Sequence, residues 1–326
     1  MNATIRDVAR EAGVSTATVS RHYNRSGPVG PAAKRRIETA ARDLRYVPNG
    51  AARSLITRTT QTLGALLPDI YGEFFSEVLR GLDTAAQRAG YHLLVSSSHH
   101  DRRGVEHALQ AMRGRVDGLV VMAPDLDAQL LRDNLPSDMR VVLAGCLAEG
   151  YPAVTIANYD GARDAMRHLA AAGHRRIAFI TGPAGNHDAA ERLRAYGDAV
   201  RAHGLDAAPE LIAAGDFSDL SGYQAAQLLT ALPERPTAIF VANDAMAVAA
   251  LGALREAGLN VPGDVAVVGF DDIPMARYVT PPLTTVRTPL ARLAACAVDV
   301  LLNVSVPPVR LALSTELVVR ASCGTA

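Results

Sequence analysis

The stretch from Thr4 to Arg21 constrains the fold more than any other, because it predicts two short helices separated by one tight turn. Thr4 can cap a first helix together with Asp7, and apolar residues follow at the i, i+3, i+4 and i+7 spacing of one buried helix face. Gly13 can adopt the left-handed conformation that a sharp reversal needs, and Ser15 is placed to cap a second helix. The stretch therefore predicts a helix-turn-helix unit, in which the second helix enters the major groove of DNA.

The exposed residues of the second helix are the candidates for contacts with DNA. Arg21 is the strongest of them, because its guanidinium can bind guanine O6 and N7 together. Thr16 and Ala17 can offer a methyl group to a base edge, and Ser20 lies on the same exposed side. The plain alternative is a small helical pair that only packs, since the pattern is short and its false-positive risk is real.

The residues that follow favour the DNA-binding interpretation. Pro31 is placed at the first position of a third helix, which carries an apolar stripe and several basic residues and completes a three-helix head by Tyr46. Residues 1–60 contain 11 Lys and Arg against 4 Asp and Glu, whereas the remainder contains 22 against 29. A basic end on an acidic body suits a protein that contacts phosphate at one end only.

From Leu63 onward, short apolar runs alternate with longer helical patterns, which is typical of βαβ units in parallel sheets. The first series predicts strands at 63–67, 91–96, 118–122 and 141–143 and helices at 74–89, 104–113 and 128–134. The second series predicts helices at 161–172, 191–203, 221–231 and 245–257 and strands at 176–180, 238–242 and 265–270. Two such series predict two α/β subdomains around a cleft, with a ligand at the carboxyl ends of the strands.

Several other classes of protein are disfavoured. The chain has no signal-peptide pattern and no run of about 18 apolar residues, so we expect a cytoplasmic protein without a membrane partner. The three cysteines are widely spaced and odd in number, which predicts reduced thiols rather than disulfides or a metal site. A freestanding sugar-binding protein is the other competitor, but it would need an export signal and has no use for residues 1–55.

No catalytic residue, metal ligand or cofactor is predicted. The sequence lacks a Gly-x-Ser-x-Gly elbow, a Walker loop, a His-Glu-x-x-His pair and a Gly-x-Gly-x-x-Gly turn, so an enzyme is disfavoured. His99, His100 and Asp101, with His107 nearby, suggest a metal site. Imidazoles in a polar loop after a strand are more often simply solvated, so we predict no metal there.

Three motifs carry a resemblance that covers essentially the whole chain. They are Thr-Ile-x-Asp-Val-Ala from Thr4, Val-Ser-x-x-Thr-Val-Ser-Arg ending at Arg21 and Pro-Asn-x-x-Ala-Arg-Ser-Leu ending at Leu55. With them the chain resembles the lactose/galactose-repressor (LacI/GalR) family of transcription regulators. The resemblance implies an all-α helix-turn-helix head and an α/β effector domain of two doubly wound parallel-sheet subdomains, similar to a periplasmic sugar-binding protein. It also implies a homodimer on double-stranded operator DNA.

The resemblance implies domain boundaries as well. We expect a head at 1–47, a hinge helix and linker at 48–61 and an effector domain at 62–326. The N-subdomain is expected at about 62–157 and 286–314 and the C-subdomain at about 158–285 and 315–326, with chain crossings near Ala157, Thr284 to Val286, and Ser314. Because no leucine heptad precedes Ala326, we expect dimers rather than tethered tetramers.

In that family the hinge helices lie in the minor groove, and a leucine at the position of Leu55 wedges between base pairs and kinks the duplex. Gly50 stands where the family usually has a helix former and should weaken the free hinge helix by roughly 1 kcal/mol. The predicted DNA-binding residues are therefore Thr4, Ser15, Thr16, Ala17, Thr18, Ser20, Arg21, Asn24, Arg53 and Leu55.

The resemblance also implies an effector site, in which the arginine at Arg192 faces the ligand and Phe217 stacks on it. The predicted effector-binding residues are Asp69, Tyr71, Phe74, Phe75, Asn186, Asp188, Arg192, Phe217, Asn243 and Asp271. Two departures from the family pattern affect this site. Gly72-Glu73 replaces the customary Asn-Pro, and Gly145-Cys146 replaces an Asp-Arg pair, so a common carboxylate contact is lost or replaced.

Each of these residues also has a plain structural interpretation. Arg192 with Asp271 or Asp188 can be an ion pair across the cleft, the two phenylalanines can belong to the core, and Asn243 can simply cap a helix. Taken together, a charge fork, carboxylates, amides and aromatics that converge on one crevice favour a polar small-molecule site.

The composition of that site favours a sugar-like effector, because hydroxyl groups both donate and accept hydrogen bonds. The sequence thus predicts a DNA-binding regulator, most simply a repressor of carbohydrate-utilisation genes, whose operator affinity a sugar controls. A regulator that responds to a non-sugar metabolite such as a purine is the alternative. The same residues serve an inducer or a corepressor.

Overall fold

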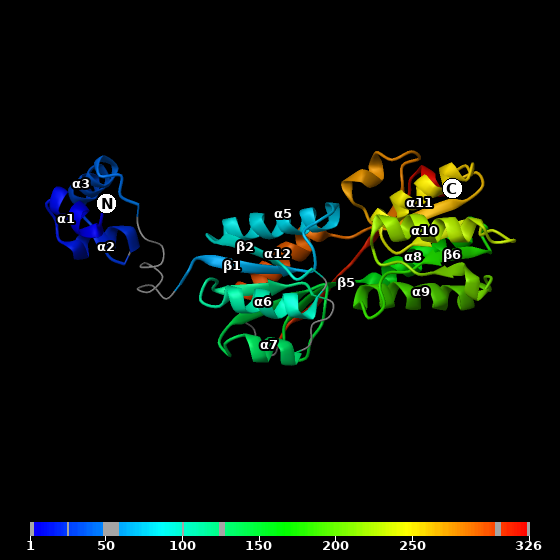
Figure 1. Ribbon diagram of the computed structural model, residues 1–326, viewed down its shortest axis with the longest axis horizontal. Helices are drawn as coiled ribbons and strands as arrows, with labels where there is room; N and C mark the ends of the chain where they lie inside the picture. Colours follow the sequence, from blue (N-terminus) through cyan, green and yellow to red (C-terminus); the bar gives the residue numbers. More distant parts are fainter. Residues whose placement is uncertain are drawn as a thin grey trace. The chain divides into compact units, whose positions relative to one another are not determined.

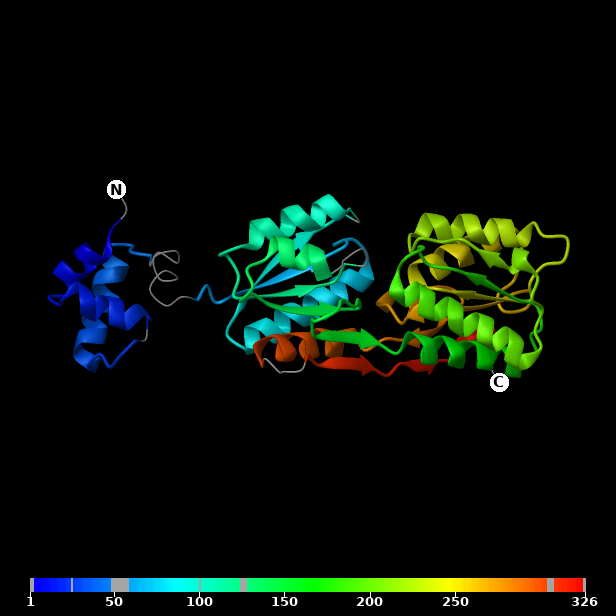
Figure 2. The ribbon, with the colours of Figure 1, turned by 90° about the horizontal axis from the view of Figure 1, so that it is seen from below.

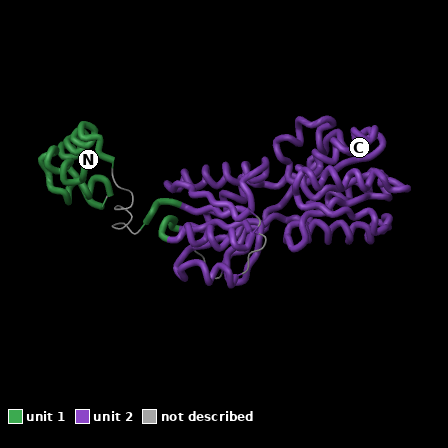
Figure 3. Tube along the Cα trace, viewed as in Figure 1, with its two compact units in different colours: residues 1–62, 114–117 green, residues 63–113, 118–326 purple. Residues whose placement is uncertain are grey.

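The computed structural model describes residues 3–24, 26–47, 59–99, 101–123, 128–303 and 308–324. The chain divides into two compact units, which Figure 3 distinguishes by colour. The first unit comprises residues 1–62 and 114–117, and the second comprises residues 63–113 and 118–326.

The head is a three-helix bundle with the predicted turn between its first two helices. Its helices are α1 (Ile5–Glu11), α2 (Thr16–Asn24) and α3 (Pro31–Asp43). Thr4 and Asp7 form the expected capping box at α1, and Gly13 has a φ of 59°. Val8, Val19 and Ile37 come from different helices and are completely buried against one another. The helix-turn-helix prediction is confirmed.

The first sheet of the second unit has six strands in the order β11-β5-β4-β3-β1-β2. Its strands are β1 (Thr62–Leu67), β2 (His92–Ser97), β3 (Gly118–Val121), β4 (Arg140–Ala144), β5 (Ala153–Ile156) and β11 (Arg310–Leu313). Its helices are α5 (Glu73–Arg88), α6 (Arg102–Met112), α7 (Ala128–Asn134) and α12 (Leu290–Leu302). Helices α5 and α12 pack together, and α6 and α7 lie on the other side of the sheet (Figure 1). Gly81 permits the close α5–α12 approach, since a Cβ there would lie 2.7 Å from the Cβ of Ala294.

The second sheet has six strands in the order β12-β10-β9-β8-β6-β7. Its strands are β6 (Ile177–Ile180), β7 (Ile212–Ala213), β8 (Ala238–Val241), β9 (Ala266–Asp271), β10 (Thr284–Arg287) and β12 (Glu316–Val318). Helices α8 (Asn158–Ala171) and α9 (His187–His203) pack as one pair, and α10 (Asp219–Thr230) and α11 (Asp244–Glu256) as another. Only β12 is antiparallel among the pairings described for this sheet. Short 3-10 segments occur at Pro209–Leu211, Pro274–Arg277 and Ala321–Cys323.

The chain passes between the two sheets three times, and Figure 2 shows the three connections side by side. Two of them fall at Ala157 and at Ser314, where the sequence indicates them. The middle one differs. Thr284, Thr285 and Val286 belong to β10, which pairs with β9 inside the second sheet, so the chain leaves that sheet only after Arg287. Burial explains this, because all three side chains lie in the interior.

Most other predicted elements are present with ends shifted by a few residues. The largest shift is at α9, which begins at His187 rather than at Glu191. Asn186 causes it, because its side chain caps the helix and allows the polar residues after it to form the first turn. Strands β5, β7, β10, β11 and β12 and helix α12 have no counterpart in the predicted series. No described helix is both long and apolar enough to span a bilayer.

Candidate functional site

The head presents the predicted base-reading residues on the exposed side of α2. Thr16, Ala17 and Arg21 are exposed, and the Arg21 Nε lies 3.4 Å from the carbonyl oxygen of Ala17. The basic side chains of Lys34 and Arg35 are exposed on α3. The arrangement places a guanidinium and small side chains where a major groove can receive them.

Several other predicted head residues form hydrogen bonds within the head itself. Ser15 accepts a hydrogen bond from the backbone of Thr18, and the two hydroxyl oxygens lie 2.9 Å apart. Thr4 belongs to the capping box of α1, and Asn24 donates to the hydroxyl of Ser20 at 3.0 Å. The predictions for Arg53 and Leu55 lie outside the described residues.

Arg192 is the centre of the second candidate site. It projects from α9 and is only 3% exposed. Its Nε donates to Asn158 Oδ1 at 2.9 Å, and its Nη1 donates to the carbonyl oxygen of Ala242 at the end of β8. The guanidinium lies over the ring of Phe270, with its Cζ 3.7 Å from the ring centroid. The guanidinium is therefore held by neighbours from three elements.

Two carboxylates flank this guanidinium, that of the buried Asp271 and that of the half-buried Asp188. Asp271 ends β9, is 6% exposed, and its Oδ1 lies 3.6 Å from Nη2 of Arg192. Asp188 lies one turn before Arg192 on α9. The Oδ1 atoms of Asp188 and Asp271 accept no hydrogen bond from any described residue. The ion pair that the sequence suggests is present, but α9 and β9 belong to the same subdomain, so it does not cross the cleft.

Burial changes the acid–base properties of both carboxyl groups. It raises the pKa of Asp271 to about 7, although the charge of Arg192 opposes the change and that of Asp188 adds to it. Burial also raises the pKa of Asp188, against the opposing influence of Arg192, His187 and Asn158. The site therefore disfavours having both carboxylates ionised at once.

The two predicted amides serve as helix caps. Asn186 Oδ1 accepts from the backbone of Ala189 at 2.9 Å, and Asn243 Oδ1 accepts from the backbone of Met246 at 3.0 Å. Asn243 also donates to the carbonyl oxygen of Phe217 at 3.0 Å. The capping interpretation is thus correct for Asn243, and this residue also fixes the backbone that carries the aromatic ring.

Phe217 is placed beside Arg192 by an unusual local backbone. Its φ is 73°, and its ring centroid lies 5.8 Å from the Arg192 Cζ. A Cβ on Gly182 would lie 2.5 Å from that ring, so only glycine allows the ring to lie there. The predicted aromatic residue is therefore next to the predicted arginine.

The first-sheet subdomain contributes Phe74 and Phe75 at the start of α5. Phe74 packs against the cores of both subdomains and meets Phe75 edge to face, whereas Phe75 packs only against the first core. Asp69 accepts from the backbones of Ile70 and Tyr71, so it shapes its own turn. Tyr71 is 79% exposed. The structure thus brings Phe74 to the seam between the subdomains and leaves Tyr71 largely in solvent.

The Gly145-Cys146 departure lies opposite Asp188. A Cβ on Gly145 would lie 3.7 Å from Asp188 Oδ2 and 3.7 Å from the methyl carbon of Met122. The Cys146 thiol is buried, and burial raises its pKa to about 11, with the charge of Asp188 adding to the shift. A carboxylate from the second subdomain therefore approaches the position at which the sequence lacks one.

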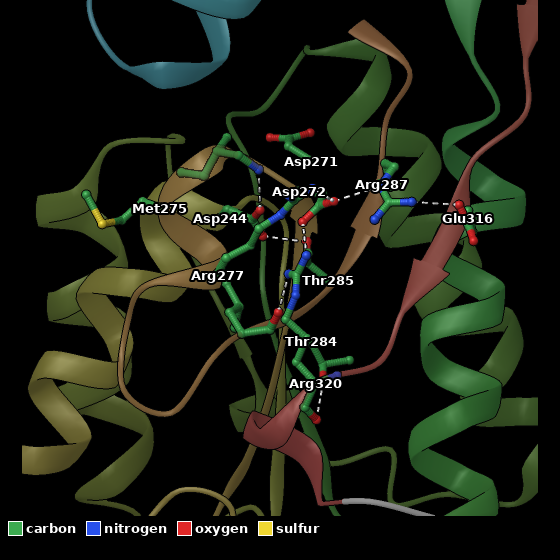
Figure 4. Close-up of polar contacts among 12 residues, drawn as sticks. Asp244, Asp271, Asp272, Met275, Arg277, Thr284, Thr285, Arg287, Glu316 and Arg320 are labelled. Carbon is green, nitrogen blue, oxygen red and sulfur yellow. Dashed lines mark hydrogen bonds and ion pairs between the residues drawn. The ribbon is translucent and has the colours of Figure 1, made fainter.

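The sequence analysis missed two polar residues that support this site. Asn158 opens α8 and holds the Nε of Arg192, and its position directly after the crossing at Ala157 is the signal that could have revealed it. Asp272, directly after β9, is the second of them. It accepts hydrogen bonds from Arg287 Nε at 2.7 Å and from Arg320 at 2.5 Å (Figure 4).

The remaining alternatives from the sequence gain no support. Asp101 caps α6 by accepting from the backbone of Gly104 at 3.2 Å, and His100 lies outside the described residues. Within the described part of the chain, no three His, Cys, Asp or Glu side chains are grouped to hold a metal ion. Cys146, Cys296 and Cys323 are free thiols, as predicted.

Comparisons with known proteins match both parts of the chain. Residues 4–49 match the family model described as bacterial regulatory proteins of the lacI family, and residues 166–323 match a periplasmic binding protein-like domain. The transcriptional regulator GalR of Escherichia coli K12 is 36% identical over 333 residues, covering 99% of this chain and 96% of GalR. The transcriptional repressor PurR of Aliivibrio fischeri MJ11 is 37% identical over 307 residues, covering 92% and 91%.

Solved structures agree with these matches. The lac repressor dimer bound to operator and the anti-inducer ONPF has a TM-score of 0.90 and 28% identity, with complete coverage of both chains. The complex of the transcriptional regulator CelR with cellobiose has a TM-score of 0.71 and 33% identity, covering 98% of this chain and 99% of CelR. With a helix-turn-helix head and a two-sheet effector domain, the chain belongs to the LacI family of DNA-binding transcription regulators, not to an enzyme family.

Proposed function

We propose that the protein acts as a homodimeric repressor of carbohydrate-utilisation genes and that a sugar bound around Arg192 controls its affinity for operator DNA. The observation that carries the proposal is the buried guanidinium between two carboxylates, each with an oxygen that accepts no hydrogen bond from the described residues. A sugar supplies hydroxyl donors to such oxygens and presents an apolar face to an aromatic ring such as that of Phe217.

Some of the predicted effector-binding residues lie around Arg192, whereas others cap helices nearby. Asp188, Arg192, Phe217 and Asp271 converge on one place, and Phe74 packs against the cores of both subdomains. Asn186 and Asn243 act there mainly as caps that position the chain. In the head we assign base contacts to Thr16, Ala17 and Arg21 and leave the hinge contacts of Arg53 and Leu55 as predictions.

A purine effector is the second candidate, and the 37% identity to the transcriptional repressor PurR is the observation that favours it. The composition of the site favours the sugar instead. A purine is best held between two aromatic faces, but Arg192 already covers the ring of Phe270. The two unsatisfied carboxylate oxygens also offer more acceptors than a planar base needs.

The test combines ligand screening with operator binding by the full-length protein. Thermal-shift screening against monosaccharides, disaccharides and nucleobases should identify a sugar, because a ligand at 100 times its dissociation constant stabilises a protein by about 2.7 kcal/mol. The same sugar should change the affinity for operator DNA in a gel-shift titration. Stabilisation by a nucleobase, with none by any sugar, would overturn the proposed effector class.

A variant separates the effector site from DNA binding. Asp271→Asn keeps the size of the side chain and removes an acceptor next to Arg192, so the sugar should bind less tightly. Operator affinity without ligand should stay unchanged, because Asp271 belongs to the unit that does not contain the head. An Asp271→Asn protein that responds with an unchanged midpoint would place the effector elsewhere.

A further inference from the structure

The hydrogen-bonding capacity of Arg192 is largely used within the protein. Its Nε is bound by Asn158 and its Nη1 by Ala242, while Nη2 faces Asp271 and the flat face of the group lies on Phe270. Arginine binds phosphate and carboxylate groups best through a free edge with two parallel N–H donors. Only Nη2 of this buried guanidinium makes no hydrogen bond with a described residue, so no edge with two parallel N–H donors is free and the group is poorly suited to receive an anion.

The carboxylates beside Arg192 offset its positive charge. Asp188 and Asp271 lie beside the one guanidinium, and on α9 the charge of Glu191 raises the pKa of Asp188 whereas that of His187 lowers it. Asp244 lies behind the site, where it accepts from Thr285 and from the backbone of Ile273 and is completely buried. A negatively charged ligand would therefore find no uncompensated positive charge in this site.

Neighbouring cations do not change this balance. Arg287 and Arg320 point toward Asp272 and form ion pairs with it (Figure 4). The carboxylate of Asp271 lies apart from these ion pairs. On the facing side, a Cβ on Gly145 would lie 3.7 Å from Asp188 Oδ2 and 3.7 Å from the methyl carbon of Met122. This part of the opposite wall is small and apolar.

The two free carboxylate oxygens define what the ligand must bring. A buried acceptor without a donor is costly, so a ligand that supplies hydroxyl or N–H donors to Asp188 Oδ1 and Asp271 Oδ1 gains affinity. A phosphate dianion brings acceptors only. We therefore propose that this crevice selects effectors that carry hydrogen-bond donors and no negative charge, with Asp188 and Asp271 as the residues that exclude phosphate esters. The inference rests on the proposed effector site.

The experiment compares matched pairs of ligands on the full-length protein by isothermal titration calorimetry. The probes are D-galactose and D-glucose with their 6-phosphates, D-ribose with its 5-phosphate, and guanosine with guanosine monophosphate. An uncharged probe should bind at least 100-fold more tightly than its own phosphate ester. A phosphate ester that binds as tightly as its uncharged partner would overturn the inference, and so would a panel in which no uncharged probe binds.

The guanosine pair separates this inference from the proposed sugar effector. If guanosine binds, its monophosphate does not and no sugar binds, then the sugar class is wrong and the exclusion of charge stands. If a sugar and its phosphate bind equally, then the sugar class stands and the exclusion of charge is wrong.

A charge-neutralising variant tests the role of Asp188 directly. Asp188→Asn keeps the shape of the side chain and removes one negative charge, so the preference for the uncharged probe over its phosphate should fall at least tenfold. Asp160→Asn is the matched control, because Asp160 is an exposed residue of α8 paired with Arg163, and the preference should stay unchanged. A melting curve for each variant establishes that it is folded. An Asp188→Asn protein with the wild-type preference would remove Asp188 from this role.

Discussion

At the scale of single residues, two adjacent aspartates have opposite roles. Asp271 and Asp272 both have positive φ angles, of 117° and 56°, in a region that costs of the order of 1–3 kcal/mol for residues other than glycine. Asp272 is fixed by Arg287 and Arg320, whereas Asp271 turns toward Arg192. The ion pairs of Asp272 with its arginines thus help to hold the strained backbone. That backbone in turn directs Asp271 into the site.

The raised pKa of Asp271 predicts a pH-dependent stability. The folded protein keeps this proton up to about pH 7, whereas an unfolded aspartate loses it near pH 3.9. The free energy of unfolding should therefore fall as the pH rises through this interval, because the folded state binds more protons than the unfolded state. Between pH 5 and 8 the fall from this group is about 2–3 kcal/mol, with 1.36 kcal/mol for each pKa unit.

Asp271→Asn removes this effect, since an amide does not ionise. Urea unfolding at pH 5, 6, 7 and 8 should show the variant gaining stability relative to the wild type as the pH rises. Parallel pH profiles for the two proteins would contradict the raised pKa of Asp271.

At the scale of elements, helix starts position the functional side chains. The cap formed by Asn186 starts α9 at His187, which puts Asp188 in the first turn and Arg192 one turn later. Residues four apart lie on the same face of a helix, so the carboxylate and the guanidinium point to the same side. In the head, the cap formed by Ser15 orients α2 in the same way, with Arg21 on its exposed face.

The cap of α9 can be tested against that of α6. Asn186→Ala and Asp101→Ala each remove a side-chain cap and should each cost about 1 kcal/mol in urea unfolding. Only Asn186→Ala should also weaken effector binding, because only α9 carries Asp188 and Arg192. Equal effector affinities for the two variants would mean that the start of α9 does not position the site.

The exposed face of α2 leads to a prediction about DNA. Arg21→Ala should weaken operator binding by about 1–3 kcal/mol and relax the preference at one base pair per half-site, because a bidentate contact to guanine is lost. Lys34→Ala is the comparison, since loss of a phosphate contact weakens all sequences alike and flattens the salt dependence. A gel-shift panel measures both effects. Unchanged affinity and preference in Arg21→Ala would exclude Arg21 from base reading.

At the scale of the whole molecule, regulation requires that effector binding and operator binding depend on the same conformational equilibrium. The effector domain consists of two sheets joined by three chain crossings, a design that permits the subdomains to move relative to each other. Arg287, which donates to Asp272 at one of these crossings, also donates to Glu316 just after the crossing at Ser314. Ligand and operator are coupled if the ligand favours one arrangement of the subdomains, and the coupling acts equally in both directions.

Homodimer formation is the prediction at this scale. A two-fold dimer places two heads on a two-fold operator, so the site should be a pseudo-palindrome. Sedimentation at micromolar concentration should show a dimer, and footprinting should show two half-sites. A stable monomer, or protection of a single half-site, would contradict the prediction.

The sequence by itself determined the head and most of the alternation of strands and helices. The reason is that caps, turns and apolar periodicity are local, so Thr4, Gly13 and Ser15 specify their helix ends without distant partners. Resemblance to a family placed Arg192 and Asp271 in one site, a pairing that no local pattern encodes. Strand β10 and helix α12 were not predicted as elements, although both are largely buried in the tertiary structure.

Only the tertiary structure decided the hydrogen bonds, the burial and the pKa values of the groups around Arg192. Residues 158, 188, 192, 242 and 271 lie up to 113 positions apart in the sequence, yet they meet around one guanidinium. Their hydrogen bonds, burial and raised pKa values depend on distances through space and on the exclusion of water, which a pattern of residue types does not contain. For the same reason, only the folded chain reveals that Asp188 approaches Gly145. It also reveals that Asp188 Oδ1 and Asp271 Oδ1 accept no hydrogen bond from a described residue.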